Sequence, residues 1–362
     1  MKMKDRKGKK VSLIIFLTLI IIIIIYLLTA FTNIPGLSTL RNIWIETAMT
    51  TADHQWLATY LFPQSVIENV MNQKVEDQGE VGITELNTVE KSNLIESHGY
   101  NYHIENLESI IEDLNKIEFS DDDEFGNTVL VNDKEQGIKI VEVKTSTYTG
   151  KLVFIDDPSR VFVANTNNKG SKGELILNYL DKYDAIIGIN ANGFMDYEGK
   201  GLGGDIIGYS ISNGEVWGKG NFNSYTTIGF DNENRLVVGK LKDYESYNLR
   251  DAAQYKPALI INGEVLMEGT AGWGMQPRTV VAQREDGVVM FLVVDGRKVG
   301  YSIGITMGEA AELLKKYGAV TAAACDGGSS SVLAYNGEII NKPSTPMVTG
   351  RYLPNAFLVK KK

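Results

Sequence analysis

The sequence is poor in the side chains that many enzymes use for metal binding and nucleophilic catalysis. It has one cysteine, Cys325, and three histidines, His54, His98 and His103. A single cysteine excludes an intramolecular disulfide and any site built from several cysteines. Because no histidine follows residue 103, the region from 104 to 362 can form neither a local Ser-His-Asp triad nor a histidine-built zinc site.

Basic charge is scarce outside the first ten residues. The chain of 362 residues has 36 Lys and Arg against 45 Asp and Glu, a net charge of −9. Residues 1–10 carry six basic side chains and Asp5, a net +5, which leaves −14 for the remainder. An acidic body excludes nucleic acid as the main partner, because binding a phosphate backbone needs a basic face. The composition, 43% apolar and 22% charged, excludes wholesale disorder, and the length allows about two domains.

One long apolar run lies near the N-terminus. Residues 11–31 contain no charged side chain, and a helix of this length spans about 30 Å, the thickness of a bilayer core. The basic residues precede it, so the positive-inside rule places residues 1–10 in the cytoplasm and the rest outside. A cleaved signal peptide is the alternative, but the run exceeds the usual apolar region of about 7–15 residues. We expect an uncleaved single-pass anchor in the cell membrane.

The rest of the chain divides by composition. Residues 32–100 are expected to form a membrane-proximal segment, with a helix over 65–71 that Ser65 can cap and a polar linker over 74–97. Residues 101–362 are expected to form the functional domain. Glu118 and Asp121–Glu124 form an acidic cluster that we interpret as a solvated loop. A Ca²⁺ site is the alternative, although EF-hand spacing and its glycine are missing.

From about residue 137 the pattern becomes short apolar runs between turn signals. Three Asn-Gly pairs, at 213–214, 262–263 and 336–337, suit hairpin turns with positive φ. Helical spacing predicts helices over 173–183 and 307–317. The predicted strands are 138–143, 152–155, 161–164, 185–189, 206–211, 236–238, 258–261, 279–282 and 288–294, with a closing strand at 357–359. We therefore expect an α/β or α+β fold with a mixed-sheet catalytic domain behind the N-terminal transmembrane helix.

The two predicted helices introduce an internal echo. Lys-Tyr-Asp-Ala at 182–185 begins a strand that ends at Asn192-Gly193, and Lys-Tyr-Gly-Ala at 316–319 begins one that ends at Asp326-Gly327. Polar residues after a buried strand commonly bind ligands in α/β folds. One interpretation is a domain of two related halves that share a site between these strand ends; chance similarity is the other.

The densest polar cluster follows the second of these strands. Asp326 is followed by Gly327, Gly328, Ser329 and Ser330. Glycines let backbone N–H groups approach a ligand, and consecutive N–H groups can cradle an anion. A tight turn capped by the aspartate is the structural alternative.

Further candidates are spread over three segments. Asn190, Asn192 and Gly193 end the first echo strand, and asparagine both donates and accepts hydrogen bonds, as sugar recognition requires. A G-x-G-x-x-G match at 199–204 precedes a strand, so it does not indicate a dinucleotide site, but Asp205 after it is a candidate carboxylate. Arg278 and Arg297 lie at strand ends, Asp295 lies beside Arg297, and Asn355 precedes the closing strand. Arginine forks match phosphate geometry.

Taken in order, these motifs resemble the phosphodiester glycosidase family. The matching pieces are N-x-N-G-F at 190–194, P-R-T at 277–279, V-D-G-R at 294–297, D-G-G-S-S at 326–330 and R-x-x-P-N-A at 351–356, and the resemblance covers about 135–362. The family pattern often has a third glycine where this chain has Ser329. Cys325 stands at a usually apolar position, where a small buried hydrophobe is expected.

The resemblance implies a hydrolase that releases a sugar from a sugar-1-phosphodiester, in the metabolism of a cell-surface polysaccharide or wall polymer. It implies Asp326, with Asp295 or Asp205, as acid–base group or nucleophile. Arg278 and Arg297 would bind phosphate, and Asn190, Asn192, Gly193, Asn355 and the turn Gly327–Ser330 would bind substrate. No cofactor follows from these residues. A metal-dependent phosphodiesterase holding Ca²⁺ or Mg²⁺ on Asp and Asn oxygens, and a non-catalytic module binding an anionic wall glycan, are the alternatives.

Overall fold

The computed structural model describes residues 2–51, 54–75, 80–86, 120–196, 201–218 and 225–362. Most of the linker predicted over 74–97, together with Glu118, lies outside these residues. The chain forms two compact units. The first comprises Met1–Val75 with Thr270–Met275, and the second comprises Glu76–Gly269 with Gln276–Lys362.

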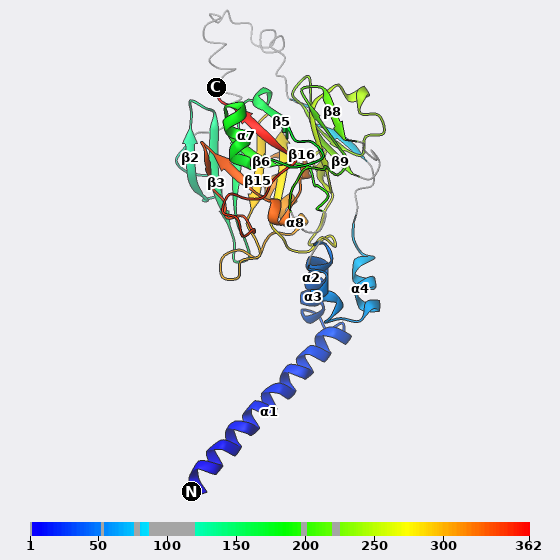
Figure 1. Ribbon diagram of the computed structural model, residues 1–362, viewed down its shortest axis with the longest axis vertical. Helices are drawn as coiled ribbons and strands as arrows, with labels where there is room; N and C mark the ends of the chain where they lie inside the picture. Colours follow the sequence, from blue (N-terminus) through cyan, green and yellow to red (C-terminus); the bar gives the residue numbers. More distant parts are fainter. Residues whose placement is uncertain (1, 52–53, 76–79, 87–119, 197–200, 219–224) are drawn as a thin grey trace, which may run out of the picture. The chain divides into compact units, whose positions relative to one another are not determined.

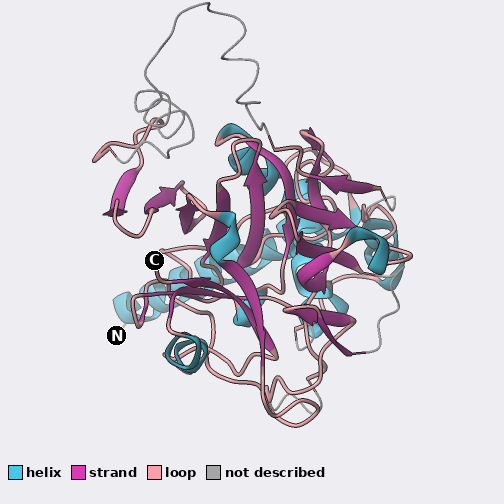
Figure 2. Cartoon of the chain, turned by 90° about the horizontal axis from the view of Figure 1, so that it is seen from above, coloured by secondary structure: helices cyan, strands magenta, loops and turns pink. Residues whose placement is uncertain are grey.

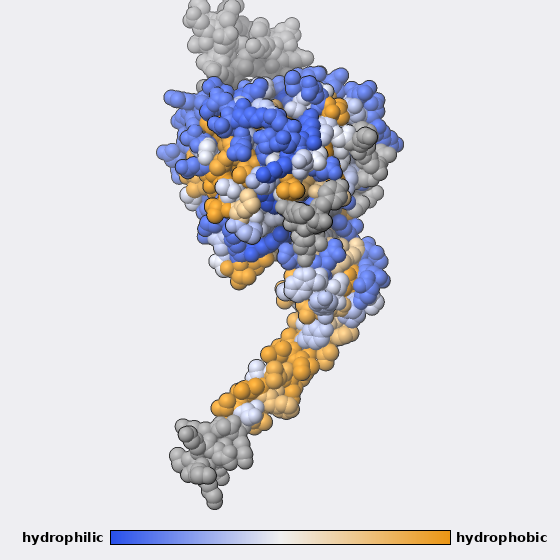
Figure 3. Space-filling model, in the orientation of Figure 1, coloured by the Kyte–Doolittle hydropathy of each residue, from blue (hydrophilic) through white to orange (hydrophobic). Residues whose placement is uncertain are grey.

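The first unit is helical. Helix α1 spans Lys2–Phe31, and its segment Val11–Phe31 is long and apolar enough to cross a membrane. Figure 3 shows the apolar surface along this helix. Helices α2 (Leu37–Met49), α3 (Trp56–Thr59) and α4 (Gln64–Met71) follow and share a small core that includes Ile45, Ala58 and Ile67. Helix α4 confirms the expected helix, but Pro63 occupies its N-cap and no side chain caps it, so the prediction that Ser65 caps was wrong.

The second unit consists mainly of strands, arranged in three sheets (Figures 1 and 2). Every strand pairing recorded among the described residues is antiparallel. The chain therefore has an α+β fold, one of the two classes expected.

The strand orders define the sheets. The six-stranded sheet runs β1 (Val81–Ile83), β10 (Leu236–Gly239), β9 (Thr226–Asp231), β11 (Leu249–Tyr255), β7 (Tyr209–Ser212), β8 (Glu215–Gly218). The eight-stranded sheet runs β13 (Glu264–Val265), β12 (Ala258–Ile261), β16 (Ala319–Ala324), β14 (Arg278–Arg284), β15 (Val289–Val294), β4 (Thr149–Ile155), β3 (Ile138–Lys144), β2 (Thr128–Asp133). The five-stranded sheet runs β18 (Glu338–Ile339), β17 (Leu333–Tyr335), β6 (Ala185–Asn190), β19 (Asn355–Lys360), β5 (Val161–Asn165).

The predicted strands correspond to strands in the structure, with shifted ends. The largest shifts are at 206–211, where β7 begins only at Tyr209, and at 152–155, where β4 begins already at Thr149. Strands β2, β9 and β11 were not predicted, nor were the short strands β8, β13, β17 and β18 that flank the Asn-Gly turns. The sequence of β9, T-T-I-G-F-D, hides its burial because both threonines, like the rest of the strand, are buried. Strand β1 lies inside the segment expected to be a linker.

The three Asn-Gly turns are confirmed. Each asparagine has φ 49° and the glycines that follow have φ between 78° and 81°. Each pair joins a two-residue hairpin, β7–β8, β12–β13 and β17–β18. Positive φ at both central residues matches the right-handed twist of the strands that the turn connects.

Both helices of the internal echo are present. Helix α7 (Ile176–Tyr183) precedes β6, and helix α8 (Met307–Lys316) precedes β16. Asp184 and Gly318, at equivalent places in the echo, both turn the chain with positive φ, 47° and 87°. Helix α8 starts with a capping box, in which Thr306 Oγ1 accepts from the Glu309 N–H and the Glu309 carboxylate accepts from the Thr306 N–H. The two strands lie in different sheets, and both end near the candidate site.

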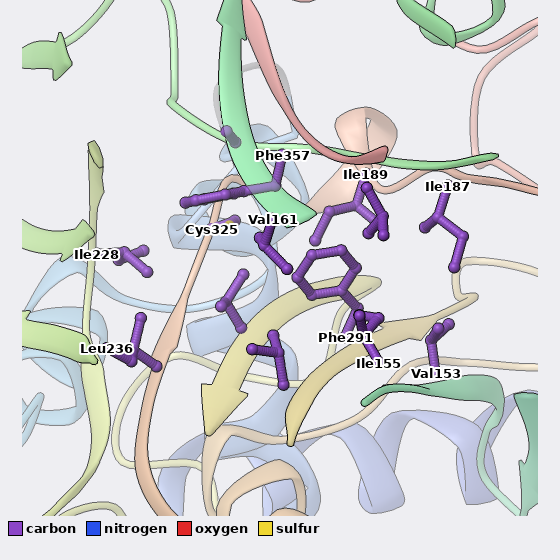
Figure 4. Packing of buried hydrophobic residues seen from close by; sticks show 14 of the residues in the cluster. Val153, Ile155, Val161, Ile187, Ile189, Ile228, Leu236, Phe291, Cys325 and Phe357 are labelled. Carbon is purple, nitrogen blue, oxygen red and sulfur yellow. The ribbon is translucent and has the colours of Figure 1, made fainter. Parts of the chain in front are cut away.

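Side chains from all three sheets form one hydrophobic core (Figure 4). Phe291 of β15 lies 6.4 Å from Phe357 of β19, measured between ring centroids, and Ile228 of β9 joins the same cluster. Strands β4, β14 and β15 are buried along nearly their whole length. Cys325 is a free, buried cysteine in this core, as expected. The core fixes the ends of the strands that carry the site.

We expect Phe291→Ala to lower the free energy of unfolding by about 3–5 kcal/mol, because the fully buried ring leaves a cavity between two sheets. Denaturant unfolding of the full chain in detergent, followed by tryptophan fluorescence, measures this change. Leu130→Ala is the control, since Leu130 is 44% exposed, and should cost less than about 1 kcal/mol. Equal losses for the two variants would contradict the assignment of the core.

Candidate functional site

The ends of β6 and β16 meet, although the strands belong to different sheets. The Asp326 N–H donates to the carbonyl oxygen of Ala191 at 2.9 Å, and Asn190 Nδ2 donates to the carbonyl oxygen of Asp326 at 2.6 Å. Both strands follow a helix and a tight turn, so each delivers its polar residue at the same end. The structure thus brings the two predicted clusters together.

Asp326 lies at the start of a glycine turn. Its Oδ1 accepts from the N–H of Gly327 at 2.9 Å, and its carboxylate also takes side-chain hydrogen bonds from Ser330 and Tyr255. The N–H of Gly328 donates to the carbonyl oxygen of Pro277 at 2.9 Å. Gly328 has φ 63°, a conformation that favours glycine, and begins the short 3₁₀ turn Gly328–Ser330. Ser329 sits within that turn, where φ is ordinarily negative, so it fits without a third glycine.

Two arginines approach this turn because it lacks side chains. A Cβ added to Gly327 would lie 3.8 Å from Arg278 Nη1, and one added to Gly328 would lie 2.9 Å from Arg297 Nη2. Arg278 is buried, with 5% of its surface exposed. Arg297 Nη2 donates to Gln276 Oε1 at 2.8 Å. Arg278, Arg297 and Asp326 therefore lie around one turn.

The pKa values reflect burial of charge at this turn. Burial lowers the pKa of Arg278 to about 10, and the neighbouring Arg297 contributes in the same direction, while Tyr255 and Asp326 oppose the shift. Burial raises the pKa of Asp326 above its ordinary value, and the hydrogen bonds from Ser330, Tyr255 and Gly327, with the charge of Arg351, hold it down. The arrangement suits an anionic ligand beside a reactive carboxylate.

Tyr255 is a site residue that the sequence did not reveal. It ends β11, and burial raises the pKa of its phenol. Its ring packs so closely on the chain at Gly193 that a Cβ there would lie 2.6 Å from Tyr255 Cε2. The absence of a side chain at Gly193 therefore allows Tyr255 to reach the carboxylate of Asp326. Because β11 itself was not predicted, no sequence signal pointed to this residue.

Arg351 is a second residue that was missed, although its motif was recognised. Arg351 Nη1 donates to Ser329 Oγ at 2.9 Å, and Nη2 forms an ion pair with Asp196. The guanidinium also lies over the ring of Phe194, 4.7 Å from its centroid. It is the first residue of R-x-x-P-N-A, from which only Asn355 was selected. The spacing of that motif could have identified it.

The three predicted substrate-binding asparagines lie beneath the site and bond to protein groups. Asn190 Oδ1 accepts from Thr279 Oγ1 at 2.7 Å and from the N–H of Val332 at 3.2 Å. Asn192 Nδ2 donates to the carbonyl oxygens of Ile207 and Tyr209, both at 3.0 Å. Asn355 Nδ2 donates to Asn192 Oδ1, and Asn355 Oδ1 accepts from the Asn192 N–H. These hydrogen bonds hold together the strand ends that carry the site.

The other two predicted carboxylates are placed differently from Asp326. Asp295 is 2% exposed, and its carboxylate accepts from Tyr301 Oη at 2.8 Å, Asn341 Nδ2 at 3.0 Å and the N–H of Lys342 at 2.9 Å. These bonds give Asp295 a role in anchoring loops. Asp205 is exposed, and its carbonyl oxygen accepts from the N–H of Met195 at 2.9 Å.

Comparison with known proteins agrees with the site. Residues 183–360 match the sequence model of the phosphodiester glycosidase family. This match supports the resemblance to that family that the motifs carry. All of the site residues described above lie inside the matched segment, and the match points to a hydrolase of the glycosidase type.

Two individual proteins resemble the chain. The catalytic domain of zebrafish N-acetylglucosamine-1-phosphodiester alpha-N-acetylglucosaminidase, solved in a form auto-inhibited by its pro-peptide, superimposes with a TM-score of 0.50 and 19% identity, covering 62% of this chain and 82% of that one. This likeness supports the fold. An uncharacterized SPbeta prophage-derived protein of Bacillus subtilis, YomE, is 26% identical over 200 residues, 52% of this chain and 29% of that protein. The chain thus matches less than a third of that relative.

The acidic cluster does not resemble a metal site. Asp123 Oδ2 accepts from the N–H of Phe125, the N–H of Asn127 and the hydroxyl of Tyr317, so it caps a turn. Among the described residues, no group of three or more His, Cys, Asp or Glu side chains could hold a metal ion.

We expect Tyr255→Phe to move the acidic limb of the pH–rate profile to higher pH. The hydroxyl lowers the pKa of Asp326 by donating to its carboxylate, so its removal raises that pKa further. If Asp326 reacts as the carboxylate, activity falls as pH falls through this pKa, and loss now begins at higher pH. The measurement is kcat/KM against pH with a glycosyl phosphodiester.

Tyr335→Phe is the matched control, because Tyr335 donates to Asp133 at 3.1 Å in another part of the fold. It should leave the profile unchanged. Equal acidic limbs for wild type and Tyr255→Phe would exclude the tyrosine from control of Asp326.

We expect Gly328→Ala to weaken the affinity for inorganic phosphate about tenfold, because the new methyl group displaces the Arg297 guanidinium. Titration calorimetry on the full chain in detergent measures this affinity. Gly337→Ala is the control, since Gly337 has φ 81°, a similar strain, but nothing within 4 Å of an added Cβ. If both variants bind phosphate equally well, Arg297 does not contribute to the anion site.

Proposed function

We propose that this protein is a membrane-anchored hydrolase that cleaves a sugar-1-phosphodiester outside the cytoplasm. One observation carries the proposal. Two arginines, Arg278 and Arg297, and one carboxylate, Asp326, surround a glycine turn. A substrate of the N-acetylglucosamine-1-phosphodiester type, part of a cell-surface polysaccharide or wall polymer, suits this arrangement.

In the proposed reaction the phosphate lies between Arg278 and Arg297. A water molecule attacks the anomeric carbon, the bond from that carbon to the phosphate oxygen breaks, and the phosphate monoester leaves with the electron pair. Asp326 takes the proton of the attacking water. The phosphate gains one negative charge as the bond breaks, so the arginines stabilise the transition state more than the ground state. Because phosphate is a good leaving group, a single carboxylate suffices.

The other predicted residues support these three. We assign Asp295 to holding the loop that carries Arg297, and Asn190, Asn192 and Asn355 to fixing the strand ends. Gly193, Gly327, Gly328, Ser329 and Ser330 shape the turn and its access. Arg351 is assigned to the rim, where it bonds to Ser329 and faces Asp326. Asp205 is the second candidate acid, because its exposed side chain follows the segment that carries Asp196.

We place the catalytic unit on the outer side of the membrane. Residues 1–10 carry a net charge of +5 and directly precede the apolar part of α1, and basic residues favour the cytoplasmic side. A cleaved signal sequence is the alternative for this helix. Mass spectrometry of the membrane-extracted protein separates the two, because an anchor retains residues 1–31.

Hydrolysis in ¹⁸O-labelled water tests the reaction. An α-N-acetylglucosaminyl phosphodiester is incubated with the full chain in detergent, because a fragment starting near residue 96 would remove β1 from its sheet. We expect the label in the released sugar. Asp326→Asn should lower kcat at least about 100-fold, since an amide cannot accept the proton. Asp243→Asn, at an exposed loop position, is the control and should retain activity.

The other outcomes support other functions. Label in the phosphate, with activity lost in EDTA, favours a metal-dependent phosphodiesterase. The absence of product with this and other glycosyl phosphodiesters, while phosphate still binds, favours a module that binds an anionic wall glycan. Activity of Asp326→Asn within a few-fold of wild type would remove Asp326 from the mechanism.

A further inference from the structure

Helix α2 holds a short segment, Thr270–Met275, that lies far away in sequence. The N–H of Met275 donates to Thr47 Oγ1 at 3.0 Å, and Thr50 Oγ1 donates to the carbonyl oxygen of Trp273 at 3.3 Å. Glu46, buried with 6% of its surface exposed, bonds to the side chain of Thr270 and the backbone of Gly274. Glu46 and Thr47 in the last turn of α2, together with Thr50 at its C-cap, therefore bind this segment.

The chain after α4 binds the same segment from another element. The N–H of Val75 donates to the carbonyl oxygen of Ala271 at 3.0 Å, and Trp273 Nε1 donates to the carbonyl oxygen of Val75 at 2.9 Å. Lys74 Nζ lies over the indole ring, 3.6 Å from its centroid. We call these contacts of Glu46, Thr47, Thr50, Lys74 and Val75 with residues 270–275 the clasp.

Two glycines show that the clasp is a close fit. A Cβ on Gly274 would lie 2.5 Å from the backbone nitrogen of Thr47, and one on Gly272 would lie 2.4 Å from Lys74 Cα. Both glycines have positive φ, 63° and 75°. Backbone contacts this short exclude any side chain at either position, so the segment and the helices are shaped for each other.

The clasped segment continues directly into the site. Met275 is followed by Gln276, which accepts from Arg297, by Pro277, whose carbonyl oxygen accepts from Gly328, and by Arg278. Holding Met275 restricts the positions available to the next three residues. One of those residues is Arg278 itself. Gln276 holds Arg297, and Pro277 holds the glycine turn, each through one hydrogen bond.

We propose that Thr47, Thr50 and Trp273 are positioning residues that hold residues 276–278, and with them the phosphate-binding arginines, in place. The identity of the ligand rests on the proposed function, but the clasp itself does not. The segment after the apolar helix then has a task in catalysis besides joining anchor and domain.

Hydrogen exchange of the full chain in detergent tests the clasp independently of activity. Thr47→Val removes the acceptor for the Met275 N–H. We expect the amides of 275–279 and of the Gly328 turn to exchange about fivefold faster, the effect of one lost hydrogen bond. Thr47→Ser should restore wild-type exchange. Thr51→Val is the matched control, because Thr51 Oγ1 bonds only to the nearby Ala48 and His54 backbone.

A second variant and a second measurement guard against misfolding. Trp273→Phe keeps a ring beneath Lys74 but removes the hydrogen bond to Val75, and should give the same exchange pattern. Titration with inorganic phosphate should show about threefold weaker binding in Thr47→Val and Trp273→Phe, and unchanged binding in Thr51→Val.

A second contact of Gln276 defines the result that would contradict the proposal. Gln276 also pairs with Ile305 through two backbone hydrogen bonds, and this bridge could fix the site without the clasp. Faster exchange confined to 270–275, with the Gly328 turn and phosphate affinity unchanged, would overturn the proposal. If wild type does not bind phosphate while exchange at Gly328 still follows the clasp variants, the proposed function fails and the clasp stands.

Discussion

The candidate site depends on one buried amide side chain, that of Asn190. It donates to the carbonyl oxygen of Asp326 and accepts from Thr279 and from the backbone of Val332. These partners come from the end of β16, from β14 and from the chain leading into β17, so a single side chain joins two sheets. Unsatisfied buried amide groups are costly, and full satisfaction makes the junction specific. Asp326 is placed where it is because its backbone is tied to β6 on both sides.

Glycine then allows charge to gather at that junction. Gly327 and Gly328 after Asp326 have no side chains, and the guanidinium groups of Arg278 and Arg297 lie beside them. Gly193 likewise has no side chain, and the ring of Tyr255 packs against its backbone. Gly193, Gly327 and Gly328 thus leave space beside the Asp326 carboxylate for side chains from other elements. Arg278 begins β14 and Tyr255 ends β11, while Gly193 itself follows β6, so all three sheets contribute. A functional group at such a junction needs contributions from all three sheets, which explains why the site residues are so dispersed in sequence.

The sequence allowed prediction of those site residues whose neighbours in the sequence form a recognisable motif. Asp326 and Arg297 follow apolar strands, Arg278 begins one, and all three stand beside glycine or proline. The structure brings them together. The sequence did not reveal the partners of the asparagines, because a sequence shows that an amide can bond but not that Asn192 bonds to Ile207, Tyr209 and Asn355. It missed Tyr255, because β11 reads L-R-D-A-A-Q-Y and its burial arises from tertiary packing alone. Hairpins were predictable at each Asn-Gly pair because their turn chemistry is local.

In the proposed reaction the total charge at the site stays constant, while negative charge moves from Asp326 to the phosphate. A phosphodiester bound beside Asp326 brings a second negative charge, which by itself would favour the protonated carboxyl. Arg278 and Arg297 offset that charge, so Asp326 can remain an acceptor for a proton. As the bond breaks in the proposed reaction, Asp326 becomes neutral and the phosphate becomes doubly charged. The negative charge moves from the carboxylate, held by Tyr255 and Ser330, toward the arginines, where burial makes each interaction stronger than in water.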